Sequence, residues 1–208
     1  MVKNVLDLFC GSQSITKAGK ELGYNTFSTD IEFKSDYKID ILNFDYNKVP
    51  FIPDIIWASP PCTSFSVAGI SHHWRKIGEQ YKYISDKAEL GIKLVLKTKE
   101  IISLYLCMNN SLIYYVENPR GLLRKLPIMD SFPIRHTVTY CQYGDSRMKA
   151  TDIWTNNRKW HPRPMCKNGD KCHVSAPRGS RTGTQGLKNA YEKSIIPHEL
   201  CLEVLTQI

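Results

Sequence analysis

The fold is decided by one stretch, Asp54-Ile55-Ile56-Trp57-Ala58-Ser59-Pro60-Pro61-Cys62. Its apolar run predicts a buried β-strand over 54–58, and the prolines after it cannot donate to a sheet ladder. Because proline also pushes the residue before it into extended geometry, Cys62 is held on a stiff arm beyond the strand. Ligands of open α/β sheets bind outside the carboxyl ends of the strands. The stretch therefore predicts a thiol at a ligand-binding edge.

A second apolar run, at 112–116, ends in Glu117-Asn118-Pro119-Arg120-Gly121. If both runs are parallel strands, Glu117 and Cys62 lie at the same edge of the sheet. A cysteine and a glutamate that face one pocket indicate covalent catalysis with acid assistance. The alternative is that Cys62 is a small buried residue and Glu117 an acid at the start of a helix.

The other patterns predict a single α/β domain over 1–208 with a mostly parallel sheet. Strands are predicted at 2–9, 24–28, 37–41, 54–58 and 112–117, an antiparallel pair at 134–143 and 151–155, and helices at 15–22, 85–109 and from 195 onward. The polar stretch 63–83 is long for a connection, so we expect a binding loop whose basic residues contact phosphates. The segment 156–186 has almost no periodicity and is rich in Pro, Gly, Lys and Arg.

Two acids follow the predicted strands of the first half. Gly11 lies in the turn after the first strand, and Asp30 ends the second, which is the opening of a dinucleotide-type sheet. Asp30 can accept the two hydroxyls of a ribose, or it can be a capping or turn residue. Asp40 lies near the end of the third predicted strand, 37–41, and can receive an adenine amino group or be a turn residue.

Composition limits the class of protein. The chain has 208 residues and a formal net charge of +8, which favours a polyanionic partner, with nucleic acid the commonest, although charge can also serve solubility alone. Seven cysteines without regular spacing indicate free thiols in a reducing compartment. Strand-like sequence begins at Lys3 and no apolar run reaches about 18 residues, so neither a signal peptide nor a membrane span is expected.

Taken in order, these pieces resemble a DNA (cytosine-5)-methyltransferase, in the compact form common in phage genomes. Asp7-Leu8-Phe9-Cys10-Gly11 resembles the first S-adenosylmethionine motif, Pro61-Cys62 with Ser64 the catalytic Pro-Cys motif, and Glu117-Asn118 the catalytic Glu-Asn pair. The resemblance implies a Rossmann-like methyltransferase fold with one antiparallel strand pair near the C-terminus. It assigns catalysis to Cys62, Glu117 and Asn118, cofactor binding to Asp7, Phe9, Gly11, Asp30, Asp40 and Pro60, and substrate binding to Ser64, Arg147 and Lys149.

The chemistry that the resemblance implies is methylation of cytosine C5 with S-adenosylmethionine as donor. Cys62 would add to C6 of the base, while Glu117 would hydrogen-bond N3 and the 4-amino group, and Asn118 would position Glu117. Backbone N–H groups around Gly11 would hold the carboxylate of the donor's methionine part. The target base would be flipped out of duplex DNA or already single-stranded. The implied setting is restriction-modification in the cytoplasm of a bacterial or phage-infected cell.

Three departures from the family pattern leave other functions open. Gln13 stands where the family has a second glycine, Arg147-Met148-Lys149-Ala150-Thr151 replaces its Gln-x-Arg-x-Arg run, and only the segment 156–186 replaces a target-recognition domain. The alternatives are a catalytically degenerate nucleic-acid-binding module or decoy, and methylation of RNA or of a free nucleotide. An amino-methyltransferase is less favoured because Cys62 follows the prolines, where that chemistry has an aromatic residue.

None of the residues assigned to catalysis is predicted to bind a metal, but the segment 156–186 contains four residues that can bind a metal ion. His161, Cys166, Cys172 and His173 are residue types that form tetrahedral zinc sites. Their spacing is not the tight Cys-x-x-Cys of common zinc modules. The alternative is a group of reduced thiols and packed imidazoles.

Overall fold

A computed structural model describes residues 2–175, 187 and 189–208. Within this part of the chain, a seven-stranded sheet has the order β3-β2-β1-β4-β7-β9-β8. Its strands are β1 (Asn4–Leu8), β2 (Asn25–Asp30), β3 (Tyr37–Lys38), β4 (Ile55–Ala58), β7 (Ile113–Pro119), β8 (Ile134–Thr139) and β9 (Ala150–Thr155). All neighbours from β3 to β7 pair in parallel, and β9 is antiparallel to both β7 and β8. The predicted mostly parallel sheet, with one antiparallel pair late in the chain, is confirmed.

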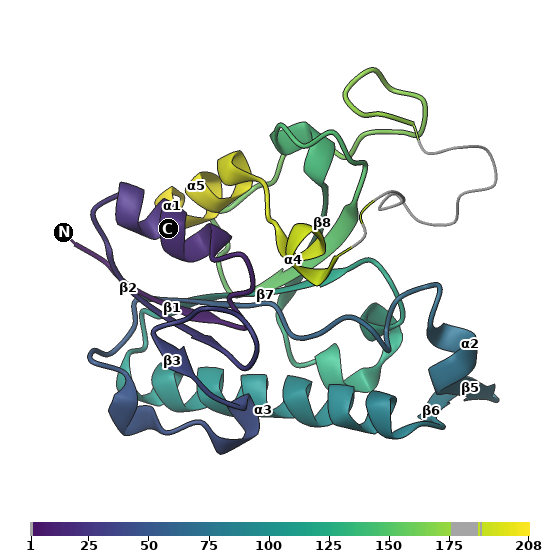
Figure 1. Cartoon of the computed structure of the whole chain (residues 1–208), viewed down its shortest axis with the longest axis horizontal. Helices are drawn as coiled ribbons and strands as arrows, with labels where there is room; N and C mark the ends of the chain where they lie inside the picture. Colours follow the sequence, from purple (N-terminus) through teal and green to yellow (C-terminus); the bar gives the residue numbers. More distant parts are fainter. Residues whose placement is uncertain (1, 176–186, 188) are drawn as a thin grey trace.

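Helices cover both faces of the sheet (Figure 1). The α-helices are α1 (Ser14–Glu21), α2 (Ile70–His73), α3 (Asp86–Met108), α4 (Ala190–Ser194) and α5 (His198–Thr206). The shorter 3-10 helices are η1 (Ile41–Asn43), η2 (Tyr46–Lys48), η3 (Leu123–Lys125), η4 (Pro127–Met129) and η5 (Tyr140–Tyr143). Helices α1 and α5 lie on one face and α3 lies on the other, which places β4 in the middle of three layers.

The alternation of side chains along β4 explains why its sequence is apolar throughout. Ile55 and Trp57 pack in the core beneath α1 and α5, whereas Ile56 and Ala58 pack in the core on the α3 side. Both faces of a parallel sheet are buried, so each successive residue of such a strand must be apolar. A central strand with two covered faces then carries the Pro-Pro-Cys arm to the sheet edge.

Helix α3 begins and ends as its sequence predicts. The side chain of Ser85 accepts a hydrogen bond from the N–H of Ala88, and Asp86 and Glu89 lie in the first turn, where acids are favourable.

None of the helices in the described part of the chain has the length and apolar composition that crossing a membrane requires.

Two local predictions in the first half of the chain are wrong. The third strand stops after Lys38, because Asp40 accepts the N–H of Leu42 and starts the 3-10 helix η1. The predicted loop 63–83 instead contains α2 and the antiparallel hairpin of β5 (Trp74–Ile77) and β6 (Gln80–Tyr83), beyond one end of α3 (Figure 1). Buried Trp74 anchors this hairpin by donating from Nε1 to the carbonyl of Ser64 at 2.9 Å.

The last part of the chain also differs from the prediction. Strand β8 ends at Thr139 and turns into η5, and a short helix, α4, precedes the predicted final helix. Over 156–175, all of which the structure describes, there is neither a helix nor a strand, in agreement with the missing periodicity. The remainder of the predicted irregular segment, 176–186, lies outside the described residues.

Candidate active site

The tips of β4 and β7 meet at one edge of the sheet. These strands are parallel and in register, with Ala58 opposite Val116, so Glu117 lies beside the point where the proline arm leaves β4. A cavity of about 610 Å³ at this edge is lined by both Cys62 and Glu117. The sequence placed these two side chains at a common edge, and the structure brings them to the same cavity.

Asn118 does not line this cavity, because adjacent residues of a strand point to opposite faces. Its buried amide Nδ2 donates a hydrogen bond of 2.9 Å to the carbonyl of Pro60. Asn118 therefore fixes the arm that carries Cys62, whereas the sequence analysis had it positioning Glu117. The bond ties the two strand tips together directly.

Glu117 is 5% exposed and is contacted by two side chains from the late strand pair. The hydroxyl of Tyr140 donates to Glu117 Oε1 at 3.1 Å, and Lys149 Nζ lies 3.8 Å from the same oxygen. Lys149 Nζ also lies 4.7 Å from the centre of the Tyr140 ring. Sequence reasoning missed Tyr140, since nothing in its alternating strand pattern separates it from the other tyrosines.

The charges around Cys62 set the state of its thiol. Burial raises the pKa of Cys62, and the negative charge of Glu117 raises it further. The ammonium groups of Lys149 and Lys193 act in the opposite direction. Sequence analysis missed Lys193, which comes from α4 and lines the cavity. The raised pKa of Cys62 lowers the fraction of its thiol that is present as thiolate at neutral pH.

A second wall of the cavity comes from β1 and the turn after it and from the ends of β2 and β3. It contains the predicted cofactor residues Asp7, Phe9, Gly11, Asp30 and Asp40, whereas Pro60 and Ser64 line the cavity from the segment that carries Cys62. Gly11 has φ of +49°, and a Cβ there would lie 2.8 Å from Ser194 Oγ. A side chain at this position would be both strained and obstructed, so the turn needs glycine.

Each of the three acids on this wall holds a turn while it lines the cavity. Asp7 is buried and accepts a bond of 2.7 Å from Thr16 Oγ1 of α1, and burial raises the pKa of Asp7 to about 7. Asp30 accepts the N–H of Gly11 at 2.9 Å through one oxygen and two N–H groups of its own loop through the other. Asp40 caps η1 through Oδ1. Asp30 and Asp40 therefore hold their loops as the turn interpretation expects, and because both also line the cavity their binding roles stay predictions.

This wall fits a nucleoside. Apolar side chains of Phe9, Ile31 and Ile41 stand beside the carboxylates of Asp30 and Asp40, and a ribose and a purine need both kinds of group. Ile31 was not predicted, although it is 57% exposed directly after the acid that ends β2. The cavity volume lies within the range of about 300–1,000 Å³ typical of small-molecule sites.

No family model matches the chain. A protein of frog virus 3 (isolate Goorha), named "Probable DNA (cytosine-5)-methyltransferase", is 33% identical to it over 174 residues, which are 81% of this chain and 77% of the relative. The chain belongs to the DNA (cytosine-5)-methyltransferase family. Activity of the cytosine-5 methyltransferase type follows from this membership, whereas the restriction-modification and phage associations stay predictions.

A solved methyltransferase structure has the same fold as this family member. The Entamoeba histolytica methyltransferase EhMeth superimposes with a TM-score of 0.56 at 13% identity, over 80% of this chain and 57% of that one. A mutant of Spodoptera frugiperda DNMT2 gives a TM-score of 0.45 at 19% identity, over 76% of this chain and 51% of that one. The chain thus spans little more than half the length of the solved structures it matches.

The first departure from the family pattern has a backbone explanation. Gln13, which replaces the family's second glycine, has φ of +60° in the left-handed region that favours glycine. Its side chain donates from Nε2 to the carbonyl of Lys34 at 2.8 Å. The hydrogen bond offsets part of the strain that a residue with a Cβ has in this conformation.

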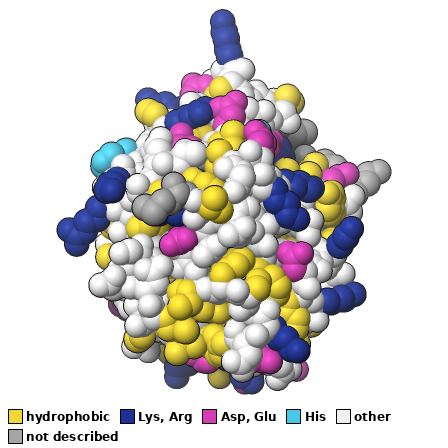
Figure 2. Space-filling view, turned by 90° about the vertical axis from the view of Figure 1, so that its left-hand side faces the viewer, with side chains coloured by type: hydrophobic (Ala, Val, Ile, Leu, Met, Phe, Trp, Pro, Cys, Tyr) yellow, Lys and Arg dark blue, Asp and Glu magenta, His cyan; other side chains and the backbone are white. Residues whose placement is uncertain are grey.

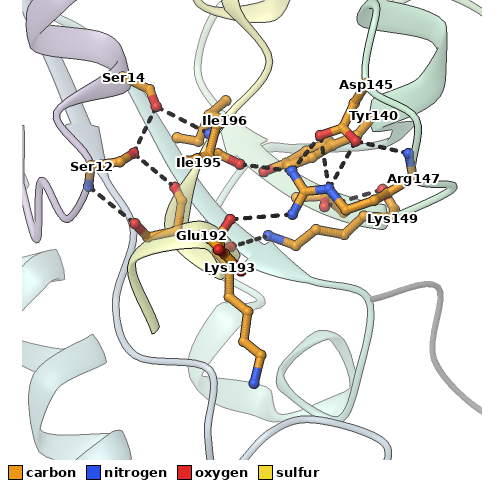
Figure 3. Close-up of polar contacts among 12 residues, drawn as sticks. Ser12, Ser14, Tyr140, Asp145, Arg147, Lys149, Glu192, Lys193, Ile195 and Ile196 are labelled. Atoms are coloured by element: carbon orange, nitrogen blue, oxygen red, sulfur yellow. Dashed lines mark hydrogen bonds and ion pairs between the residues drawn. The ribbon is translucent and has the colours of Figure 1, made fainter. Parts of the chain in front are cut away.

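The N–H groups predicted to hold the methyl donor's carboxylate are already bonded in this methyltransferase. Asp30 accepts the N–H of Gly11, and Ser194 Oγ accepts the N–H of Ser12 at 3.0 Å. Helix α4 reaches this turn because Ile196, just beyond it, donates to Ser14 Oγ at 3.1 Å (Figure 3). These two N–H groups are therefore occupied in this structure, and the role predicted for the N–H groups of this turn stays a prediction.

The two basic residues predicted to contact substrate are used differently (Figure 3). Lys149 lines the cavity and donates to the carbonyl of Lys193 at 3.3 Å. Arg147 lies outside the cavity, and its Nε donates to both oxygens of Asp145 at 2.8 and 2.9 Å. Its other nitrogens donate to the carbonyls of Glu192 and Ile195. Arg147 holds α4 against the late strand pair, and its assignment to substrate binding is not supported by this geometry.

Proposed function

We propose that this protein transfers a methyl group from S-adenosylmethionine to C5 of cytosine in DNA, through a covalent bond between Cys62 and C6. The observation that carries the proposal is the shared cavity of Cys62 and Glu117, which come from separate strands. The name of the frog virus 3 relative supports DNA as the substrate class. The family's chemistry requires a nucleophile and an acid on the same base, and this cavity supplies both.

The covalent step makes C5 reactive. The Cys62 thiolate forms a bond to C6, and the electrons of the C5–C6 double bond move to C5 and the N3 side of the ring. C5 would then form a bond to the methyl group while the S–CH₃ bond of the sulfonium donor breaks, which leaves S-adenosylhomocysteine. Loss of the C5 proton and cleavage of the S–C6 bond restore the ring and free the thiolate. Splitting the reaction in this way replaces one difficult step by two easier ones.

Glu117 would stabilise the charge that moves toward N3. Within the described residues, its contacts with Tyr140 and Lys149 go to Oε1, so Oε2 is the oxygen available to the pyrimidine. A carboxyl group that shares a proton with N3 draws electrons away from C6 while the sulfur adds. Tyr140 would hold the carboxyl group in place during this step.

The described residues also assign positions to the methyl donor. When bound, S-adenosylmethionine supplies an electrophilic methyl group. Asp30 would accept the ribose hydroxyls, Asp40 the adenine amino group, and Phe9 and Ile31 would contact the faces of the adenine. These side chains line the same cavity as Glu117.

Nucleic acid would reach the cavity from the side of the β5–β6 hairpin. Its exposed Arg75, Lys76 and Lys82 can contact phosphates, and the target base must be flipped out or unpaired to reach Cys62. On the face shown in Figure 2, by contrast, basic side chains are scattered among acidic and apolar ones. Methyl transfer should therefore fall as salt concentration rises.

The test is transfer of labelled methyl groups to duplex DNA, single-stranded DNA and RNA of the same sequence. We expect 5-methylcytosine in DNA, no product with Cys62→Ala, and normal product with Cys107→Ala, a matched control because Cys107 is exposed on α3. Label in RNA alone would replace DNA by RNA as the substrate. A wild type that binds both DNA and S-adenosylmethionine but transfers nothing would favour the non-catalytic module.

A further inference from the structure

Four metal-ligating side chains from two separate parts of the chain converge outside the cavity. Cys141 belongs to η5, and Cys166, Cys172 and His173 belong to the irregular segment after β9. The ligand atoms of all four lie within 4.8 Å of one another. We propose that these residues bind a structural zinc ion with a Cys₃His ligand set. The inference is independent of the proposed function.

The distances between the ligand atoms match the edges of a zinc tetrahedron. Zn–S bonds of about 2.3 Å and Zn–N bonds of about 2.0 Å imply edges of roughly 3.5–3.8 Å. Cys172 Sγ lies 3.6 Å from both Cys141 Sγ and His173 Nδ1, and Cys166 Sγ lies 3.8 Å from His173 Nδ1. The remaining measured edge, from Cys141 Sγ to Cys166 Sγ, is 3.0 Å and would lengthen on metal binding. It is far longer than a disulfide bond of about 2.05 Å.

The backbone between the two cysteines is folded to present both sulfurs to one point. The side chain of Asp170 accepts the N–H of Lys167 at 2.6 Å, and the N–H of Asp170 donates to the carbonyl of Lys167 at 3.1 Å. Gly169 completes this tight turn with φ of +96°, which favours glycine. The turn reverses the chain after Cys166 and brings Cys172 back beside it.

Neighbouring groups orient the proposed ligands. Thr139 Oγ1 accepts the N–H of Cys166 at 3.0 Å, which attaches the segment to the end of β8. Gln142 Nε2 lies 3.4 Å from Cys172 Sγ, where it can donate to a metal-bound thiolate. Polar partners of this kind are the usual outer shell of a metal site.

The sequence-based zinc hypothesis named the wrong fourth ligand. His161 is exposed and is not part of the cluster, and Cys141 takes its place. Cys141 lies outside the irregular segment 156–186, so only the folded chain shows the set to be complete. The four positions are all filled by protein side chains, which is the arrangement of a structural site and not of a catalytic one.

The proposed ion explains how a segment without helix or strand keeps a defined path. Such a segment has few backbone partners, and metal binding contributes folding free energy directly. The ion would also connect this segment to η5, where Tyr140, next to Cys141, donates to Glu117. The zinc site would therefore support one wall of the catalytic cavity from behind.

Metal analysis of the full-length protein, purified without chelator or a metal-binding tag, tests the proposal. We expect about one equivalent of zinc in the wild type and in the Cys107→Ser control, as a four-ligand structural site predicts. Cys166→Ser and Cys172→Ser should lose most of it, whereas His173→Cys, which keeps four ligands, should retain it. Equal zinc contents in the ligand variants and the control would overturn the proposal.

A second measurement avoids the problem that a ligand variant fails to fold. Wild-type protein stripped of metal is titrated with Co²⁺, which we expect to give the intense visible bands of tetrahedral coordination and a thiolate charge-transfer band at one equivalent. Weak octahedral bands, or no binding, would contradict the proposal. Mass spectrometry of the protein before and after reduction gives a further check. A mass that is lower by two hydrogens before reduction would show a disulfide in place of the metal and would also contradict the proposal.

Discussion

Four of the seven cysteines of this protein lie in two environments that differ in what faces the sulfur. Cys62 lies in a cavity with a carboxylate and two lysines, while Cys141, Cys166 and Cys172 face one another and an imidazole. In the first environment the sulfur has room for an external partner. In the second, protein sulfurs and nitrogen occupy every side. The comparison teaches that the neighbours of a thiol, and not its residue type, decide between nucleophile and metal ligand.

The largest effect that tests this comparison is expected from Glu117→Gln. Glutamine keeps the shape and still accepts the hydroxyl of Tyr140, but it cannot share a proton with N3. We expect single-turnover methyl transfer to slow by about 10²–10⁴-fold, the usual range for general acid–base groups. Zinc content, which depends on the other environment, should stay unchanged. A variant that transfers at close to the wild-type rate would remove Glu117 from the mechanism.

The next effect concerns the bond that joins the two strand tips. Asn118→Ala leaves the carbonyl of Pro60 without its partner, which should lower the free energy of unfolding by about 1–3 kcal/mol. Methyl transfer should fall as well, because the arm that carries Cys62 loses its anchor. Urea unfolding checks the first expectation, with the exposed Asn110→Ala as control. Equal stability of the two variants would show that the bond does not hold the arm.

Alkylation by iodoacetamide compares the two environments directly. Burial and the charge of Glu117 raise the pKa of Cys62 above its ordinary value, so its reaction should accelerate with pH from 7 to 9 as the thiolate fraction grows. Glu117→Gln removes a negative charge, lowers the pKa of Cys62 and should speed the reaction at pH 7. Lys149→Met should slow it.

Mass spectrometry of the cysteine-containing peptides measures these rates one residue at a time. Peptides with Cys166 or Cys172 should stay unmodified until a chelator removes the metal. An alkylation rate of Cys62 that does not depend on pH, or that falls in Glu117→Gln, would contradict the account of its surroundings.

The smallest effect is expected in the turn after β1. Gln13→Gly and Gln13→Ala both lose the bond to the carbonyl of Lys34, but only alanine keeps the strain of a left-handed residue. The glycine variant should be more stable than the alanine variant by about 1 kcal/mol. Thermal or urea unfolding of the pair measures this difference. A more stable alanine variant would contradict the backbone explanation of Gln13.

The sequence predicts the part of the site that depends on strand order. Apolar runs that end in Pro60-Pro61-Cys62 and in Glu117 identify two strand tips, and parallel pairing places them at one edge. Tyr140 and Lys193 could not be predicted, because contacts between distant segments bring Tyr140 to Glu117 and Lys193 to the cavity. Cys141 was missed for the same reason, since it lies 25 residues before Cys166 in the chain.

Local side-chain hydrogen bonds account for most of the errors in the fold. The periodicity of 37–41 favours a strand, but the Asp40 side chain caps a 3-10 helix instead. The stretch 63–83 is polar and has no long apolar pattern, yet one buried tryptophan, Trp74, is enough to anchor a hairpin. A pattern of apolar residues does not report interactions of this kind.

Capture of the covalent intermediate tests the central claim most directly. In duplex DNA with 5-fluorocytosine at the target position, the fluorine replaces the C5 proton whose loss releases the enzyme. With S-adenosylmethionine present, the wild type should therefore form a complex that survives denaturation, with the DNA attached at Cys62. Cys62→Ala should form none. An active wild type that leaves no such complex, or a complex attached at another residue, would contradict the account.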